Sequence, residues 1–316
     1  RKRDEATKQT VVTGVKSRYA LSQPGLLTPD TKYYWRVKAK DAKGLWGPWS
    51  RTFRFTARGV AQPIDLAVNF DTTAGAGTLK WKANPVGAKP AKYRVYASDE
   101  KGFTVADRPF QSTVGVSKKE MGSWAQRFPA NFVAETDGTQ MVVIGPDAPK
   151  AANKAYYRVV AVDAQGKRSG PSDYATGPRP VIHSRPVTTA KVGQEYSYEV
   201  CTNRSLGDLT ARMMDKNQRS GYFDIEKPQF AIVKGPAWLK IDGATGVLSG
   251  TPDAAGKYEV EVTVTIDRKV RKLDESKLIW GLEKVLSETT ERVGVSTQKF
   301  VIDVQQDVLA QRPCVP

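Results

Sequence analysis

Short runs in which hydrophobic and polar residues alternate recur along the chain, separated by clusters of Gly, Pro, Asn and Asp. Alternation with a period of two is typical of strands that bury one face, and the Gly and Pro residues between the runs indicate turns. We therefore expect an all-β protein built from antiparallel β-sandwiches. The clearest predicted strands are Tyr33–Ala39, Thr52–Thr56, Gly77–Trp81, Tyr93–Ala97, Tyr156–Val162 and Tyr258–Ile266.

One segment, Asp274–Leu286, has the spacing of an amphipathic helix. Gly281 lies inside it and a stretch rich in Thr and Val follows, so a helical turn that leads into a long strand fits equally well. We expect at most one short helical insertion. The residues on the apolar face of this segment are Leu278, Ile279, Leu282, Val285 and Leu286.

An eleven-residue segment occurs twice, 122 positions apart. The copies are Tyr34–Gly44 and Tyr156–Gly166, and seven of the eleven positions are identical. A third Tyr-Arg-Val, at Tyr93–Val95, opens a similar strand. Repetition of this kind indicates two homologous β units.

The first copy is preceded by Leu27-Thr-Pro-Asp-Thr-Lys-Tyr33 and continues with alternating apolar residues, an Asp and a Gly. This pattern resembles strands E and F of a fibronectin type III domain. The resemblance implies a tyrosine corner, in which Tyr33 is buried and its hydroxyl bonds to backbone upstream. The side chains expected to face the core are Tyr33, Trp35, Val37 and Ala39, and those expected to face outwards are Tyr34, Arg36, Lys38 and Lys40.

The first unit, residues 1–58, fits only the later strands of such a domain. A type III domain has about 100 residues, whereas the corner tyrosine is already at position 33. Half a sandwich exposes its core and is not stable alone. We therefore expect the chain to be the C-terminal piece of a longer polypeptide, whose missing N-terminal region completes the first sandwich.

The second unit, residues 59–178, resembles a more complete fibronectin type III domain. It has Ala155 at the place of Tyr33, so we expect its E–F crossover to be without the usual lock. The additional strands of this unit carry Leu66, Val68, Phe70, Leu79 and Trp81.

The third unit, residues 179–316, has a different pattern. Pro236–Pro252 reads Pro-Ala-Trp-Leu-Lys-Ile-Asp-Gly-Ala-Thr-Gly-Val-Leu-Ser-Gly-Thr-Pro and continues into a strand, Gly256–Val264. With Val192–Tyr198 as an opening strand, it closely resembles the Putative Ig (dystroglycan-type cadherin-like) domains of bacterial secreted proteins. The resemblance implies a third sandwich. The residues expected in its core or its tight turn are Trp238, Leu239, Ile241 and Asp242–Gly246.

Two segments of the third unit are inserted relative to a minimal domain, Asn203–Pro228 and Arg268 to about Gly294. The linkers between units are short and contain proline, at Gly59–Pro63 and Gly177–Pro180. Because proline stiffens such joints, we expect a semi-rigid rod of domains.

The 316 residues include 49 Lys and Arg against 33 Asp and Glu, a net charge of +16. Such a charge suggests an anionic partner. It is uneven, since 14 basic and 4 acidic residues give residues 1–59 a net charge of +10. We expect no nucleic-acid partner, because no helix-turn-helix, RNA-recognition or zinc-finger signature occurs. We expect no membrane span, because no apolar run approaches the ~18 residues that one needs.

One histidine and two cysteines cannot build a His/Cys metal cage. His183 lies at a linker or strand entry, and no Gly-x-Ser-x-Gly elbow accompanies it. Asp242 and Asp253 are separate loop residues and not a calcium cluster, although a calcium site between domains stays open. We expect no cofactor and no metal site.

A pair of carboxylates for glycoside hydrolysis needs a cleft. Asp224 with Glu226, and Glu259 with Glu261, are two residues apart and therefore share one face of a strand. We expect no catalytic residue and no enzyme activity in this chain.

The two cysteines, Cys201 and Cys314, are expected to form one disulfide if the protein is secreted. Closing so long a loop would stabilise the fold by about 4 kcal/mol. The alternatives are two buried thiols, or Cys314 paired outside the chain.

The segment Leu45-Trp-Gly-Pro-Trp-Ser50 resembles the Trp-Ser-x-Trp-Ser box of cytokine-receptor type III domains, with Gly47 at the first serine. The resemblance implies an intramolecular ladder of tryptophans and cations. The alternative is an aromatic and basic face that binds an anionic polysaccharide. The candidate residues are Arg36, Lys38, Lys40, Trp46, Trp49 and Arg54.

These resemblances imply a non-catalytic accessory or spacer region of a larger secreted or cell-surface bacterial protein, periplasmic location being a further option. We expect that protein to act on or adhere to polysaccharide. One alternative is an anionic carbohydrate-binding module that uses the basic face of the first unit. Another is the supporting part of an enzyme whose catalytic domain lies upstream.

Overall fold

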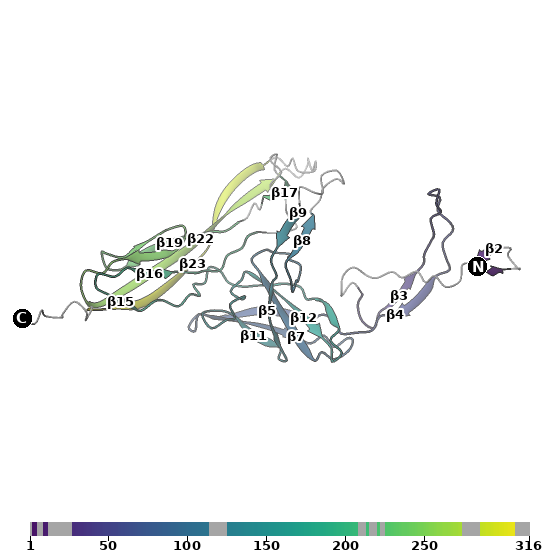
Figure 1. The fold of residues 1–316 in the computed structure, drawn as a ribbon, viewed down its shortest axis with the longest axis horizontal. Coiled ribbons are helices and arrows are strands. Elements are labelled where there is room, and N and C mark those ends of the chain that lie inside the picture. Colours follow the sequence, from purple (N-terminus) through teal and green to yellow (C-terminus); the bar gives the residue numbers. More distant parts are fainter. Residues whose placement is uncertain are drawn as a thin grey trace, which may run out of the picture.

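The computed structural model describes residues 2–4, 9–11, 27–113, 125–207, 213–214, 220–221, 225–273 and 285–306. These residues form strands and loops without a helix, which confirms the expected all-β class (Figure 1). No described element is therefore a helix long and apolar enough to cross a membrane. Most of the ambiguous segment Asp274–Leu286 lies outside the described residues, and its last two residues begin strand β23.

The described part of the first unit consists of two strand pairs. Strands β1 (Lys2–Asp4) and β2 (Gln9–Val11) pair antiparallel, as do β3 (Lys32–Trp35) and β4 (Phe53–Thr56). The aromatic rings on one face of β3–β4 stack across the ladder. These stacked pairs are Tyr33 with Phe55 and Trp35 with Phe53.

The tyrosine corner is present in the first unit. The hydroxyl of Tyr33 accepts a hydrogen bond from the backbone N–H of Thr28 at 2.7 Å. Tyr33 itself is half-buried and not buried, and Trp35 and Val37 are 45% and 55% exposed. The expectation that these side chains enter a core is therefore wrong for the described residues, because no second sheet among them covers this face of β3–β4.

The second unit is a two-sheet sandwich with antiparallel pairing throughout. One sheet has the order β11–β6–β5, and the other has the order β10–β7–β12–β13 with β14 also paired to β12. This is the arrangement expected from the resemblance to a fibronectin type III domain. The strands are β5 (Ile64–Asp71), β6 (Ala76–Lys82), β7 (Lys92–Ser98), β10 (Phe132–Thr136), β11 (Gln140–Ile144), β12 (Tyr156–Val162), β13 (Arg168–Pro171) and β14 (Ala175–Thr176), with a separate hairpin of β8 (Phe110–Thr113) and β9 (Ala125–Phe128).

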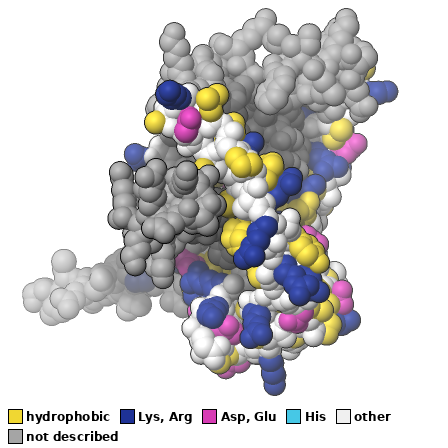
Figure 2. Space-filling model, turned by 90° about the vertical axis from the view of Figure 1, so that its right-hand side faces the viewer, with side chains coloured by type: hydrophobic (Ala, Val, Ile, Leu, Met, Phe, Trp, Pro, Cys, Tyr) yellow, Lys and Arg dark blue, Asp and Glu magenta, His cyan; other side chains and the backbone are white. Residues whose placement is uncertain are grey.

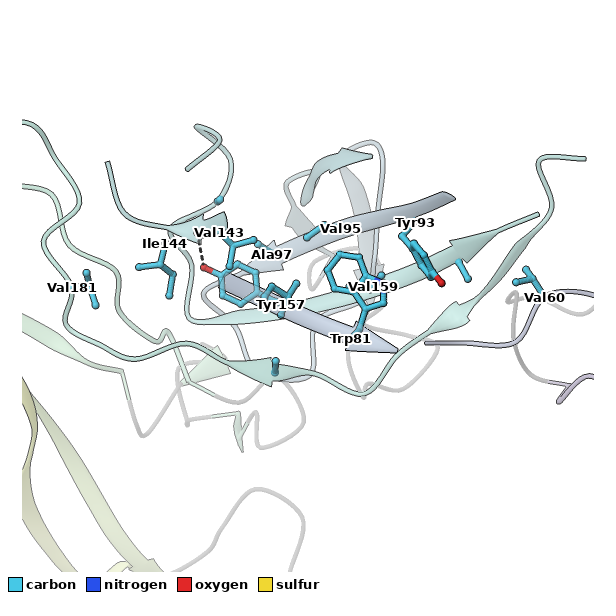
Figure 3. Packing of buried hydrophobic residues seen from close by; sticks show 14 residues of the cluster. Val60, Trp81, Tyr93, Val95, Ala97, Val143, Ile144, Tyr157, Val159 and Val181 are labelled. Atoms are coloured by element: carbon cyan, nitrogen blue, oxygen red, sulfur yellow. Dashed lines mark hydrogen bonds between the residues drawn. The ribbon is translucent and has the colours of Figure 1, made fainter. Parts of the chain in front are cut away.

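The core of the second unit lies between these two sheets (Figure 3). Alternate residues of each strand point into it, as the period of two requires. Trp81 packs edge-on against Tyr93, with ring centroids 5.4 Å apart. The residues of this core that are completely buried include Leu79, Val95, Val143, Tyr157 and Val159.

The E–F crossover of the second unit does have a lock, in contrast to the expectation from Ala155. The hydroxyl of Tyr157 accepts a hydrogen bond from the backbone N–H of Lys154 at 2.9 Å and donates one to the carbonyl of Val143 at 3.1 Å (Figure 3). Tyr157 lies two residues after Ala155 and thus on the same face of the strand. The lock has moved along the strand by one inward-facing position.

The third unit is a second two-sheet sandwich. Its larger sheet has the order β15–β23–β22–β19, in which β15 runs parallel to β23, and its smaller sheet has the order β16–β21–β20. The core between them holds Leu239 as expected, with Trp238 and Ile241 partly buried beside it. The strands are β15 (Thr189–Lys191), β16 (Tyr196–Glu199), β19 (Lys227–Lys234), β20 (Lys240–Ile241), β21 (Val247–Gly250), β22 (Gly256–Leu273) and β23 (Val285–Gln305), with a short pair of β17 (Met213–Met214) and β18 (Ser220–Gly221).

The expected tight turn follows β20. The carboxylate of Asp242 accepts hydrogen bonds from the backbone N–H groups of Ala244 and Thr245 at 2.8 and 2.9 Å. At the end of β21, Gly250 has φ of 159°, and a Cβ there would lie 2.0 Å from the carbonyl oxygen of Trp238. This position therefore requires glycine.

The second of the two expected insertions is an extension of one hairpin. Strands β22 and β23 stay paired from Gly256 with Val304 to Leu273 with Val285, far beyond the partners that β15 and β19 provide (Figure 1). The register shifts between Ile266 and Asp267, at the end of the pairing with β19. Within the first insertion, Asn203–Pro228, the structure describes residues 203–207, 213–214, 220–221 and 225–228.

Candidate functional site

The candidate site of the first unit is a hairpin over residues 36–50. The carboxylate of Asp41 accepts hydrogen bonds from the backbone N–H groups of Lys43 and Leu45 at 2.9 and 2.8 Å, which fixes the turn. The arms are then joined by the N–H of Gly47 to the carbonyl of Ala39 at 2.8 Å. This pairing brings the strand with the cations next to the segment with the tryptophans.

Five of the six candidate residues form one stack. The guanidinium of Arg36 lies 4.5 Å from the centroid of Trp49, and the ammonium of Lys38 lies 4.9 Å from it. Lys38 also lies 4.6 Å from the centroid of Trp46, and Lys40 lies 5.3 Å from it. The order is therefore Arg36, Trp49, Lys38, Trp46, Lys40.

The sixth candidate, Arg54, lies outside the stack. It is on β4, opposite Tyr34 in the β3–β4 ladder. Figure 2 views the molecule from the end at which the first unit lies, and basic and hydrophobic side chains are both exposed on this side.

The stack sets what this face can do chemically. Trp46 and Trp49 are 58% and 50% exposed, but each indole already has two cationic groups within about 5.3 Å of its centroid. Each such contact at an exposed site is worth about 0.5–1 kcal/mol. The rings are therefore engaged within the chain, which favours the intramolecular ladder over a ring platform for a sugar.

The interdomain joint between the second and third units is a buried polar cluster that the sequence did not reveal. Glu226 is 1% exposed, and both of its carboxylate oxygens accept hydrogen bonds from Nε of Arg179 at 2.8 and 2.7 Å. The same carboxylate accepts a hydrogen bond from the backbone N–H of Ser205 at 2.7 Å. The hydroxyl of Ser205 in turn lies 3.0 Å from that of Tyr156 on β12 of the second unit.

Backbone hydrogen bonds extend this joint across the two units. The N–H of Leu206 donates to the carbonyl of Asp99 at 2.7 Å, and the N–H of Lys101 donates to the carbonyl of Gly207 at 2.9 Å. Just after the linker, Val181 is buried in the core of the second unit and its N–H donates to the side-chain oxygen of Asn203. The start of the expected insertion Asn203–Pro228 thus connects the two units.

The joint between the first and second units is smaller. The carboxylate of Asp30 accepts a hydrogen bond from the backbone N–H of Gly87 at 2.9 Å. A Cβ on Gly87 would lie 2.9 Å from Cβ of Pro29 and 2.7 Å from the carbonyl oxygen of Gly59. Only glycine allows this close approach of the two units.

The predicted disulfide stays a prediction, because Cys314 lies outside the described residues. Cys201 is half-buried at the end of the opening strand of the third unit. Burial raises the pKa of its thiol, and the charge of Glu199 acts in the same direction. This environment suppresses the thiolate, so Cys201 is not activated as a nucleophile.

The remaining candidate residues, the histidine and the paired carboxylates, do not form a common site among the described residues. In the described part of the chain, no group of three or more His, Cys, Asp or Glu side chains could hold a metal ion. His183 is half-buried, and its backbone N–H donates to the backbone carbonyl of Cys201 at 3.0 Å. Burial lowers the pKa of His183, and the charge of Lys154 lowers it further. Of the carboxylate pairs, Glu226 is in the joint and Glu259 forms an ion pair with Lys234.

No curated protein matches this chain in sequence. A structure described as a "putative alpha-galactosidase" from Bacteroides fragilis matches at 18% identity and a TM-score of 0.23, over 40% of this chain and 18% of that one, so the chain spans less than a fifth of its length. The FN1–FN3 domains of chicken CNTN1 match at 9% identity and a TM-score of 0.19, over 84% of this chain and 76% of that one. Residues 179–272 match the family described as Putative Ig domain, which confirms the expectation for the third unit.

Proposed function

We propose that this chain is a non-catalytic accessory region that spaces and presents other parts of a larger bacterial protein, secreted or on the cell surface, with the periplasm as a further location. We also propose that this larger protein acts on or adheres to polysaccharide. The match of the third unit to the Putative Ig domain family and the resemblance of the first two units to fibronectin domains support the proposal.

The observation that carries the proposal is the bonded joint between the second and third units. Two domains of one chain usually move relative to one another, because the interface between them is weak. A flexible linker without further contacts would therefore leave the two sandwiches free to rotate. Here Arg179, Glu226 and Ser205 form a largely buried, charge-assisted network. Ser205 extends it to Tyr156 of the second unit, and backbone hydrogen bonds between the two units run beside it. Such a joint holds two domains at a fixed distance and orientation, as a spacer requires.

The first unit supports a further part of the proposal, that strands from outside this chain complete its sandwich. One face of β3–β4 exposes Trp35 and Phe55 to 45% and 42%, and Val37, two residues beyond β3, is 55% exposed. In the second unit, the equivalent face of β12 is covered by the sheet β11–β6–β5. We propose that strands from the N-terminal region of the longer polypeptide cover the first face in the same way.

The stack in the first unit argues against the alternative of a carbohydrate-binding face there, because the chain's own cations already lie over both indole rings. The other alternative, support of an upstream catalytic domain, is compatible with a rigid spacer and differs only in what is attached to it.

The experiment that tests the proposal compares how the second and third units tumble in solution. Backbone ¹⁵N relaxation of the whole chain is expected to give β12 and β22 one common rotational correlation time. Glu226→Ala leaves the half-buried Arg179 without its carboxylate partner and is expected to give the two units separate, shorter correlation times.

Glu259→Ala is the matched control. Glu259 is 70% exposed and its ion pair with Lys234 is far from the joint, on the surface of the third sandwich, so this variant is expected to tumble like the unchanged chain. Separate correlation times in the unchanged chain would refute the spacer proposal.

A further inference from the structure

The second unit has a hollow where the first unit has its tryptophans. When the offset of 122 positions between the two copies is continued, Arg168 corresponds to Trp46 and Pro171 corresponds to Trp49. Neither side chain fills the space of an indole ring. A cavity of about 210 Å³ lies on this face, between strands β12 and β13 and the segment 104–107.

The walls of the hollow differ in character. Val105, Val160 and Pro171 are apolar, whereas Thr104 offers a hydroxyl group. The hydroxyls of Tyr96 and Ser169 also line the hollow, but both are already bonded within the chain. The guanidinium groups of Arg158 and Arg168 and the carboxylate of Asp107 complete the polar part of the lining. A few polar groups above an apolar wall are typical of a small-molecule site.

The carboxylate of Asp107 is already matched by cations. Arg94 donates to one of its oxygens at 2.9 Å and Arg168 donates to the other at 2.6 Å. The hydroxyl of Tyr96 also donates to it at 2.9 Å. Burial raises the pKa of Asp107, but these hydrogen bonds and the charges of the two arginines together lower it below its usual value. Asp107 is therefore ionised and bound, and it does not neutralise a third cation.

Arg158 is that third cation. One terminal nitrogen of its guanidinium donates to the carbonyl of Phe103 at 3.2 Å. Its Nε is buried and has no hydrogen-bond partner in the described part of the chain. Burial lowers the pKa of Arg158, and Asp173 and Tyr174 act in the opposite direction. Its guanidinium lies 5.8 and 5.9 Å from the ring centroids of Phe103 and Tyr174, but no carboxylate of the described residues bonds to it. The hollow thus has one guanidinium whose charge and hydrogen-bonding capacity are not fully used.

We propose that this hollow binds one six-membered ring that carries a carboxylate, which in a polysaccharide is a uronic acid residue. The carboxylate pairs with Arg158 and Arg168, and the apolar face of the ring lies against Val160 and Pro171, where the first unit holds an indole ring. The ring hydroxyls meet Thr104. The choice of a sugar rests on the proposed association with polysaccharide.

The size of the cavity limits the ligand. Sites for drug-sized molecules occupy roughly 300–1,000 Å³, so a cavity of about 210 Å³ holds no more than a single ring. Affinity for one ring is expected to be low, with Kd of about 1 mM or weaker, because few atoms make contact. A polysaccharide would then be held by repeated weak contacts along its length.

The experiment is a titration of the ¹⁵N-labelled whole chain with sodium glucuronate, followed by amide chemical shifts, with glucose as the neutral control. Saturable shifts are expected around Tyr96, Arg158 and Arg168 with glucuronate, and none with glucose. Arg168→Gln removes a charge and Pro171→Trp refills the hollow as Trp49 does in the first unit. Each is expected to weaken binding at least tenfold, whereas Arg36→Gln in the stack leaves it unchanged.

Two results would overturn the proposal. One is the absence of saturable shifts in the hollow with glucuronate, and the other is equal binding by Pro171→Trp. If Pro171→Trp does not fold, Arg168→Gln decides alone, since Asp107 keeps Arg94 as its partner. Failure here is distinct from failure of the spacer proposal, because Glu226→Ala changes the joint and leaves the hollow intact.

Discussion

The first and second units carry the same repeated segment, but its inward face is bare in one unit and covered in the other. Trp35 and Val37 are 45% and 55% exposed, whereas their equivalents Tyr157 and Val159 are completely buried. The local pairing, the turn and the lock are nevertheless present in both units. The comparison shows that local hydrogen bonding sets the shape of the hairpin, while the opposite sheet determines how much each side chain contributes to stability.

The largest difference is expected from truncating the two equivalent aromatic side chains. Tyr157→Ala should destabilise the second unit by about 3–5 kcal/mol, because it opens a cavity in a closed core. Trp35→Ala should cost less than about 1 kcal/mol, because its ring is partly in water. Amide hydrogen exchange of β12 and β3 measures both free energies of opening.

Val301→Ala serves as a control for that experiment, since Val301 is 43% exposed on a long, well-paired strand. A loss from Trp35→Ala as large as that from Tyr157→Ala would break the comparison, and would show that the first face is already covered in solution.

A smaller difference is expected from removing only the hydroxyl of each lock. Tyr157→Phe leaves the N–H of Lys154 without its partner inside the protein, and the carbonyl of Val143 keeps only the hydrogen bond from the N–H of Asn153, at a cost of about 1–2 kcal/mol. Tyr33→Phe should cost less, because water can replace the hydroxyl near Thr28. Urea unfolding of the whole chain, followed by exchange at Val143 and Thr28, measures the two effects. Equal losses would contradict the argument from burial.

The stack gives the third prediction. Trp49→Ala removes the contacts with Arg36 and Lys38, and should lower the free energy of opening of residues 36–50 by about 1–2 kcal/mol. Leu45→Ala is the control, because Leu45 is 68% exposed at the turn of the same hairpin. Amide exchange at Val37 and Ser50, whose backbones are paired, measures the change. A loss no larger than that of Leu45→Ala would mean that the stack has no energetic role.

The smallest expected effect is a gain in the stability of the hairpin over residues 36–50. In the second unit the hydroxyl of Ser169 accepts a hydrogen bond from the N–H of Ala161 at 2.9 Å and donates one to the carbonyl of Gly170 at 2.6 Å. Gly47 occupies this place in the first unit, and a Cβ there would lie 3.6 Å from its nearest neighbour. Gly47→Ser should therefore stabilise the hairpin by about 1 kcal/mol. Gly47→Ala separates the hydroxyl from the loss of chain entropy, and exchange protection no greater than in that variant would count against the hydrogen bond.

Features that depend on neighbouring residues could be predicted from the sequence. Alternation predicted the strands, and the corner motif predicted the hydrogen bond of Tyr33. The outward stripe of Arg36, Lys38 and Lys40 next to a Trp-Gly-Pro-Trp box indicated which groups lie together, because a hairpin brings its two arms into register.

Features that depend on distant residues could not be predicted. Arg179 and Glu226 are separated by 47 positions, and nothing local marks them as partners. The lock of Tyr157 needs the carbonyl of Val143 from another strand of the opposite sheet. The hollow in the second unit is the absence of two rings and becomes visible only when Arg158 and the segment 104–107 are placed around it.

The parallel pairing of β15 with β23 has a mechanical consequence for the proposed spacer role. The two paired segments, Thr189–Lys191 and Asp303–Gln305, come from opposite ends of the third unit in the sequence, and further backbone hydrogen bonds flank them at Thr188 and Val192. Tension applied between the linker and residue 306 pulls these strands past one another along their length. The hydrogen bonds between the two strands lie across that direction, so they share the force and must break together. The third unit therefore resists extension until all the hydrogen bonds between β15 and β23 break.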